Sequence, residues 1–303
     1  MIRLAVRFTN DILSRQTLFD LQGITDKLSK TQQQLSSGKR ITAAEDDPYG
    51  SGRAVSLRNN LADIQQYQVN INDASAWAQQ TDSSLGNVTD LLQRARELTV
   101  QAANGTQNQD SLNAISSEMT QIKASLLAEA NSTYNGRYIF SGTATNVAPY
   151  PTNAYAGSTL PVQRLIAPGE IVKVNQDGPS AFGVQAAGPP ATKNVFDVMD
   201  DVIGALNAGN MSALQTTALT ELDGSFTTAL NARTTVGAIS NRLDTQRTRM
   251  SGQELSVTDL LSKTEDADMA KTLITYSQTQ TAYQAALQAG AKIIQPTLMD
   301  FLR

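Results

Sequence analysis

The sequence predicts a mainly α-helical protein. Both termini form a long antiparallel helical bundle or coiled-coil stem, and a small β-rich domain is inserted between two helical halves. Apolar residues recur at intervals of three and four through both halves. Aromatic residues make up only 5% of the chain, which suits long helices with narrow apolar seams. Seven of the nine prolines fall between Pro149 and Pro190, so the middle of the chain cannot continue the helical pattern.

The composition excludes several classes of function. The 303 residues include no histidine and no cysteine, which removes imidazole chemistry, thiol nucleophiles, the usual zinc sites and disulfides. A net charge of -4 argues against nucleic acid as a partner, because nucleic-acid binders normally carry a basic stripe. The chain shows no run near the roughly 20 apolar residues of a membrane helix, and its N-terminus lacks a signal-peptide core. We therefore expect no membrane partner, and no ordinary signal peptide if the protein leaves the cell.

The first helical section carries a short seam and ends in the stretch LSSGKRITAAEDDPYGSG, residues 35–52. A phosphate loop would need glycine upstream of the Gly-Lys pair and serine or threonine after it, but Gln33 and Arg40 stand there. Gly38 can end a helix and Pro48 can start one. The stretch is therefore predicted to join two helices. The seam before it consists of Leu21, Ile24, Leu28 and Leu35.

Two acidic clusters raise the question of a catalytic or metal site. Neither has the alternating spacing that aims several oxygens at one ion. Acidic residues just ahead of a helix have a plainer role at the positive end of its dipole. We expect no catalytic residue, no metal site and no cofactor. The residues concerned are Glu45, Asp46, Asp47, Glu265, Asp266 and Asp268.

One long helix is predicted from residue 57 to residue 102. Its 46 residues would extend roughly 70 Å at about 1.5 Å per residue. Three polar residues interrupt an otherwise apolar seam. The seam comprises Leu57, Asn60, Ile64, Tyr67, Ile71, Ala74, Ala78, Thr81, Leu85, Val88, Leu92, Ala95, Thr99 and Ala102.

A second helix is expected to fold back on the first. Gly105 gives a stop signal, and Asn108 or Asp110 can cap the next helix. A short connection makes neighbouring helices antiparallel. The expected seam of this second helix is Leu112, Ile115, Met119, Ile122 and Leu126.

The middle of the chain is predicted to hold short strands. STLPVQRLI and EIVKVN are rich in β-branched residues. After them, Asn194 can cap a helix from Val195 to about Asn207, and Gly209 can close it.

The C-terminal half repeats the helical pattern. One seam runs through Leu222, Phe226, Ala229, Val236, Leu243, Met250 and Val257. The last has weaker positions at Gln280 and Gly290 and consists of Met269, Leu273, Tyr276, Tyr283, Leu287, Ile294, Leu298 and Phe301. Apolar stripes thus reach almost to both chain ends, which normally fray. Either the two ends pair only with each other, or they pair and also pack against other copies of the chain.

Several motifs resemble the bacterial flagellin superfamily. The stretch at residues 35–52 and the segment NNLADIQQYQVNINDASAWAQQTDSSLGNVTDLLQRARELTVQAANGT resemble its N-terminal signature. EDADMAK, a Gln/Ala-rich helix and the final LMDFLR resemble its C-terminal signature. Within the superfamily, NGRYIFSGTATNVAPY at residues 135–150, the short insert and the opening MIRLAVRFTND resemble the hook-filament junction family, hook-associated protein 3. The alternative is a flagellin that itself forms the filament.

The resemblance implies a fold and a mode of assembly. Residues 1–40 and 262–303 would form the terminal coiled-coil stem, which is disordered in the free monomer. Residues 41–145 and 195–261 would form the long-helix core, and residues 146–194 the β-rich outer domain. The protein would be an extracellular structural adaptor, exported by the flagellar type III apparatus. It would self-associate into a ring between a neighbouring junction protein and flagellin, after an export chaperone releases its C-terminal helix.

Overall fold

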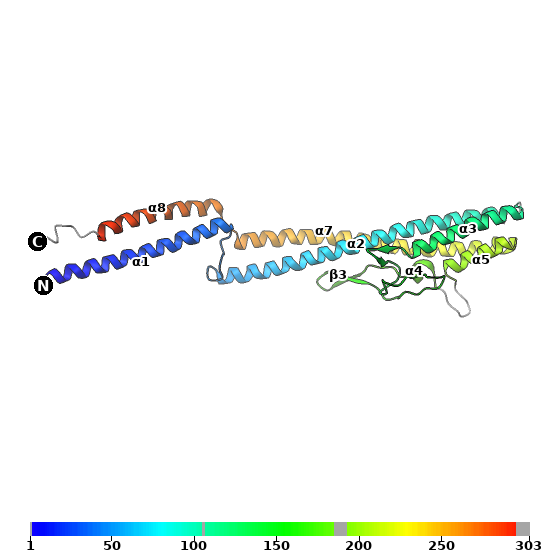
Figure 1. The fold of residues 1–303 in the computed structure, drawn as a ribbon, viewed down its shortest axis with the longest axis horizontal. Helices are drawn as coiled ribbons and strands as arrows, with labels where there is room; N and C mark the ends of the chain where they lie inside the picture. The colour runs from blue at the N-terminus through cyan, green and yellow to red at the C-terminus, as the bar shows by residue number, and fades with distance from the viewer. Residues whose placement is uncertain (1, 105–106, 185–192, 295–303) are drawn as a thin grey trace. The chain divides into compact units, whose positions relative to one another are not determined.

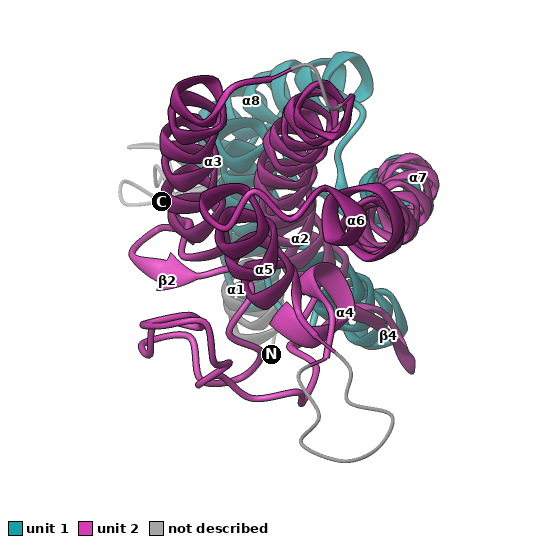
Figure 2. Ribbon diagram, turned by 90° about the vertical axis from the view of Figure 1, so that its right-hand side faces the viewer, with its two compact units in different colours: residues 1–63, 254–303 teal, residues 64–253 magenta. Residues whose placement is uncertain are grey.

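The computed structural model describes residues 2–104, 107–184 and 193–294. The chain divides into two compact units, shown in Figure 2. Unit 1 comprises residues 1–63 and 254–303, and unit 2 comprises residues 64–253. The predicted mainly α-helical class is confirmed, since long helices fill both halves and the described strands form only small two-stranded sheets.

Unit 1 is built on two terminal helices, α1 (Ile2–Ser37) and α8 (Met269–Ile294). The two helices pack side by side, and the beginning of α1 lies at the same end of the pair as the end of α8 (Figure 1). They are therefore antiparallel, as predicted for the termini. Unit 1 also holds the beginning of α2 (Pro48–Ala103) and the end of α7 (Leu219–Glu265).

The core of unit 2 lies along the rest of α2. The predicted seam from Ile71 to Ala102 is buried at every position. The hydroxyl groups of Thr81 and Thr99 donate hydrogen bonds to the backbone carbonyls of Trp77 and Ala95. Because each of these two hydroxyl groups has its hydrogen-bond acceptor within the same helix, both threonines can be buried without a polar partner on another element. The helix starts earlier than its heptad, at Pro48.

Helix α3 (Gln109–Ala130) and helix α5 (Val195–Asn207) pack against each other in unit 2. Asn108 caps α3, accepting from the Ser111 N–H at 2.8 Å, and Asn194 caps α5, as the sequence predicted. The predicted α3 seam is buried throughout. Helix α6 (Met211–Ala213) and a π-helical turn, η1 (Leu214–Ala218), then lead into α7.

The segment between α3 and α5 contains two hairpins. Strands β1 (Thr133–Tyr134) and β2 (Arg137–Tyr138) are joined by Asn135 and Gly136, both at positive φ, the geometry that an Asn-Gly turn favours. Strands β3 (Gln163–Ala167) and β4 (Glu170–Lys173) confirm the two predicted short strands; they pair antiparallel, and Gly169 between them has positive φ. The one-turn helix α4 (Gly178–Phe182) follows them. This segment packs against α5 through an aromatic cluster that consists of Phe140, Tyr150, Tyr155, Phe182 and, on α5, Phe196.

Candidate assembly interface

The most deeply buried residues of α1 and α8 are small or polar. Thr31 and Thr279 are buried to 5% and 6% exposure. A Cβ added at Gly290 would lie 3.5 Å from Cγ2 of Thr17, in ordinary van der Waals contact. Small side chains let two helices approach closely but bury little apolar surface. On α1, partly buried leucine and isoleucine residues share this helical face with Thr17 and Thr31, so the contact combines small residues with a thin apolar seam.

The apolar residues that the sequence places in the stem are divided between two environments. Six are partly buried: Leu21, Ile24, Leu28, Leu35, Tyr276 and Tyr283. Three on α8 are exposed: Met269, Leu273 and Leu287. The side chain of Ile294, and all of Leu298 and Phe301, lie outside the described residues. The role of this set in assembly stays a prediction.

Exposed apolar residues continue beyond the predicted set. Ile274 is 58% exposed beside Leu273, also 58%, and Phe19 on α1 is 71% exposed. Leaving large apolar side chains in water is unfavourable, and both terminal helices expose several of them. We name this set the stem stripe: Ile12, Leu18, Phe19, Met269, Leu273, Ile274 and Leu287. The heptad analysis missed Ile12, Leu18, Phe19 and Ile274 because they lie outside its register.

The predicted joint between the first two helices is confirmed. Helix α1 ends at Ser37, and Gly38 takes the left-handed conformation at φ 70° while its N–H donates to the Gln34 carbonyl at 2.9 Å. Helix α2 begins at Pro48. Glycine is suited to this position because it adopts positive φ without the strain of a Cβ.

The joint pairs with the connection between α7 and α8. The Arg40 N–H donates to the Glu265 carbonyl at 2.6 Å, and the Ala267 N–H donates to the Gly38 carbonyl at 2.9 Å. The Arg40 guanidinium donates to the Thr264 carbonyl at 2.8 Å. Backbone hydrogen bonds in both directions thus join the α1–α2 connection to the α7–α8 connection. We call this contact, between residues 38–40 and 264–267, the crossing.

Glu265 lies at the centre of this crossing. Glu265 is 4% exposed, and its carboxylate forms ion pairs with Lys39 at 2.8 Å and with the Arg58 guanidinium. The side chains of Lys39 and Arg58 are 42% and 47% exposed. The sequence indicated a helix-dipole role for this acidic cluster and missed the pairing. No local signal connects Glu265 to Arg58, which is 207 residues away.

The other acidic cluster shapes the joint itself. Asp46 lies 2.6 Å from Lys30 and also accepts from the backbone N–H groups of Ala43 and Thr42, each at 3.0 Å. The Lys30 interaction first, and then those N–H groups, hold the pKa of Asp46 well below its usual range. Asp47 accepts from the Gly50 N–H at 2.9 Å, so it caps the start of α2.

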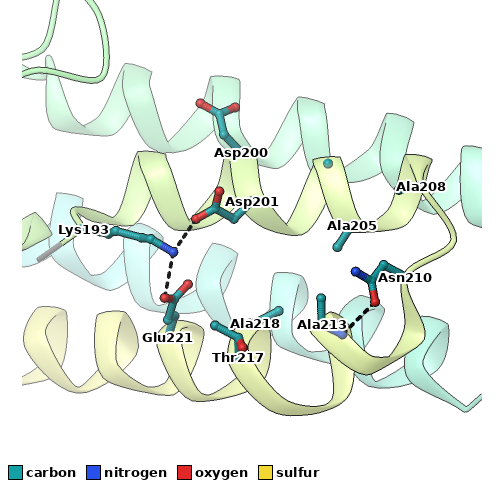
Figure 3. A pocket seen from close by; sticks show the side chains of 11 residues that line it. Lys193, Asp200, Asp201, Ala205, Ala208, Asn210, Ala213, Thr217, Ala218 and Glu221 are labelled. Carbon is teal, nitrogen blue, oxygen red and sulfur yellow. Dashed lines mark hydrogen bonds and ion pairs between the residues drawn. The ribbon is translucent and has the colours of Figure 1, made fainter. Parts of the chain in front are cut away.

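The remaining candidate is an open groove of about 430 Å³ in unit 2, between α5 and the α6–η1 segment that leads into α7 (Figure 3). Lys193 lies at one end, 2.6 Å from Asp201 and 2.9 Å from Glu221. The hydrogen bond to Asp201, followed by that to Glu221, raises the pKa of Lys193 to about 12. An ammonium held this firmly in its charged form cannot act as a base near neutral pH.

A metal-ligating cluster and a membrane-spanning helix are two further features to consider among the described residues. Among them, no three histidine, cysteine, aspartate or glutamate side chains gather as a metal site would require. Within the same ranges, no helix is both long and apolar enough to cross a bilayer. The surface that stands out is therefore the stem stripe of unit 1, together with the crossing that positions it.

Two family matches fall on the helical halves. Residues 8–145 match the bacterial flagellin N-terminal helical region, and residues 219–302 match the bacterial flagellin C-terminal helical region. The chain belongs to the bacterial flagellin family. It is a structural protein of the bacterial flagellum and not an enzyme, and it assembles with other flagellar components.

Three relatives define the resemblance further. Flagellar hook-associated protein 3 of Escherichia coli (strain K12) is 27% identical over 303 residues, covering 94% of this chain and 96% of that one. Flagellin of Bacillus subtilis (strain 168) is 27% identical over 307 residues, covering 98% and 100%. The crystal structure of Bacillus cereus FlgL has a TM-score of 0.59 at 27% identity and covers 68% of this chain and 99% of that one.

Proposed function

We propose that this protein is the adaptor that joins hook to filament, assembling as a ring between a neighbouring junction protein and flagellin. The observation that carries the proposal is the full-length similarity to hook-associated protein 3. A second relative with that name, from Salmonella typhimurium, is 28% identical over 90% of this chain and 94% of its own length.

The segment at residues 135–150 favours the junction reading over a filament-forming flagellin. It is the part that resembles junction proteins, and several of its residues are buried in unit 2. The Asn135-Gly136 turn aims Ile139 and Phe140 into the interior, where both are 0% exposed. Asn131 bonds both backbone groups of Tyr150, accepting from its N–H at 2.9 Å and donating to its carbonyl at 2.7 Å. The segment is thus anchored at Ile139, Phe140 and Tyr150, which are buried in unit 2.

We infer that assembly proceeds through the stem stripe. Ordering a residue costs about 1–2 kcal/mol in backbone entropy, while burial returns roughly 25 cal/mol per Å² of apolar surface. In the described part of unit 1, the buried apolar residues are only Ile41, Ala54 and Leu57, all near the crossing. Neighbouring subunits would supply the missing burial, which couples folding of the stem to assembly.

The same stripe accounts for the partners before assembly. Residues 1–40 and 262–303 are proposed as the stem, 41–145 and 195–261 as the core, and 146–194 as the outer domain. An export chaperone would cover the apolar positions of α8 until release. Export would follow the flagellar type III route and place the protein outside the cell.

A seeding experiment tests the proposal. Purified protein is mixed with hook fragments or with short filament fragments, followed by light scattering and negative-stain electron microscopy. A junction protein adds a short, self-limiting layer to the hook ends and then stops. Continuous growth of long filaments would identify a flagellin and contradict the junction function.

A further inference from the structure

We propose that Glu265 is a latch: one buried carboxylate whose two cations lock the crossing of unit 1 and so present α1 and α8 as a pair. The inference rests on the proposed function for its consequence in assembly. Its structural part concerns the crossing alone.

The position of Glu265 is unfavourable unless it is paired. It is the last residue of α7, where the carbonyl ends of the helix already concentrate negative charge. It is also 4% exposed, so its charge lacks hydration. Lys39 and Arg58 compensate both costs. They come from the α1–α2 connection and from α2, so the single carboxylate joins three parts of unit 1.

The latch is asymmetric because its members differ in exposure. The Glu265 side chain is 6% exposed, whereas those of Lys39 and Arg58 are 42% and 47% exposed. Losing the carboxylate leaves two cations that can turn toward water. Losing both cations leaves a buried carboxylate with no ionic partner, which is the more costly case. The backbone bonds between Gly38, Arg40, Glu265 and Ala267 remain in either case.

This asymmetry predicts an order of effects. Glu265→Gln should weaken the pairing of α1 with α8 modestly. Lys39→Met with Arg58→Met should weaken it far more. Adding Glu265→Gln to that double variant should restore much of the loss, because it removes the unpaired charge. Such non-additivity is the signature of one coupled cluster, and independent surface pairs would not show it.

Disulfide formation between two introduced cysteines can report how closely α1 and α8 are paired. It has no cysteine, so Thr17→Cys with Gly290→Cys introduces one pair of thiols across α1 and α8. A Cβ at position 290 lies 3.5 Å from Cγ2 of Thr17, which is within the reach of a disulfide. The rate of disulfide formation under mild oxidant then reports the pairing. The fluorescence of Trp77, the single tryptophan, 2% exposed in unit 2, reports whether the rest of the chain is folded.

The experiment compares cross-linking rates in the full chain. Relative to the parent cysteine pair, the rate should fall about threefold with Glu265→Gln and roughly tenfold or more with the double variant, and the triple variant should approach the single one. The matched control is Lys263→Met, which removes an exposed pair with Asp259 in the same segment and should leave the rate unchanged.

Two results would overturn the latch. One is a double variant that cross-links at the parent rate. The other is a change in Trp77 emission in the latch variants, because that would place their effect in unit 2. Incorporation at hook ends is measured in parallel without the cysteines and should fall in the same order as the cross-linking rates. A parent chain that fails to add to hooks contradicts the proposed function, whereas the order of cross-linking rates still decides the latch.

Discussion

Unit 1 and unit 2 use the same building block, the long helix, but distribute their apolar residues in opposite ways. In unit 2 the α2 seam from Ile71 to Ala102 is buried at every position. In unit 1, the most deeply buried residues of α1 and α8 are small or polar, such as Thr31, Thr279 and Gly290, while the large apolar residues of the stem stripe are exposed. Unit 2 therefore carries its own core, and unit 1 has an apolar surface that a partner can cover.

The comparison is tested first by adding one charge to the stem stripe. Leu273→Asp should abolish incorporation at hook ends, because a carboxylate there would be buried against a neighbouring subunit. The free monomer should lose less than about 0.5 kcal/mol, because Leu273 is 58% exposed. Sedimentation of seeded reactions and urea unfolding measure the two effects. Gln278→Asp adds the same charge at an exposed polar position of α8 and is the control; equal incorporation by both variants would contradict the account.

The opposite behaviour is expected in the core of unit 2. Leu85 is 0% exposed on the α2 seam, so Leu85→Ala should destabilise the chain by about 2–5 kcal/mol through lost burial and a residual cavity. Urea unfolding followed by Trp77 fluorescence measures the loss. Leu287→Ala, at a 44% exposed stem position, makes the same chemical change for comparison. A similar loss in both variants would mean that the two units do not differ in the way described.

A smaller effect is expected at the cap of α5. Asn194 is 1% exposed, accepts from the Phe196 and Asp197 N–H groups at 3.0 Å each, and donates to the Asn153 carbonyl at 2.7 Å. Asn194→Ala should cost about 2 kcal/mol in unfolding free energy. Asn108→Ala removes an exposed cap on α3 and should cost less, about 1 kcal/mol. Equal costs would show that burial adds nothing to this cap.

The smallest effect concerns the joint and depends on pH. The pKa of Asp46 is lowered in the folded chain, so its contribution to stability is present above the unfolded value of about 3.9 and is lost as pH falls toward the folded pKa. Asp46→Asn can keep the backbone bonds but removes the Lys30 pair. Amide exchange at Thr42 and Ala43 should therefore differ between wild type and variant near pH 6, and the difference should shrink below about pH 4. A constant difference would rule out the Asp46 charge as its cause.

Local signals were sufficient to predict most of the fold. Asn108 and Asn194 identified two helix starts, Gly38 and Pro48 identified the joint, and the 3–4 spacing identified the buried face of α2. Each of these depends on residues within a few positions of one another. The Asn135-Gly136 hairpin carried a local signal too, but its strands are only two residues long.

The candidate site was less predictable because it depends on distant pairs. Periodicity shows which residues share a face of α8, but it does not show which face meets α1. In the structure, Thr279 and Gly290 are buried while Leu273 and Leu287 are exposed. Glu265 likewise reads as one acid in a cluster until the fold places Lys39 and Arg58 beside it.

Hydrogen exchange on the free monomer and on the assembled protein tests the central claim most directly. We expect unit 2 amides, such as those of α2 from Ile71 to Ala102, to be equally protected in both states. We expect amides of α1 and α8 to exchange faster than these in the monomer, where the pair is only marginally stable, and to gain protection on assembly. Equal protection of α1 and α8 in both states would show that unit 1 needs no neighbour to be stable, and would contradict the coupling of stem folding to assembly.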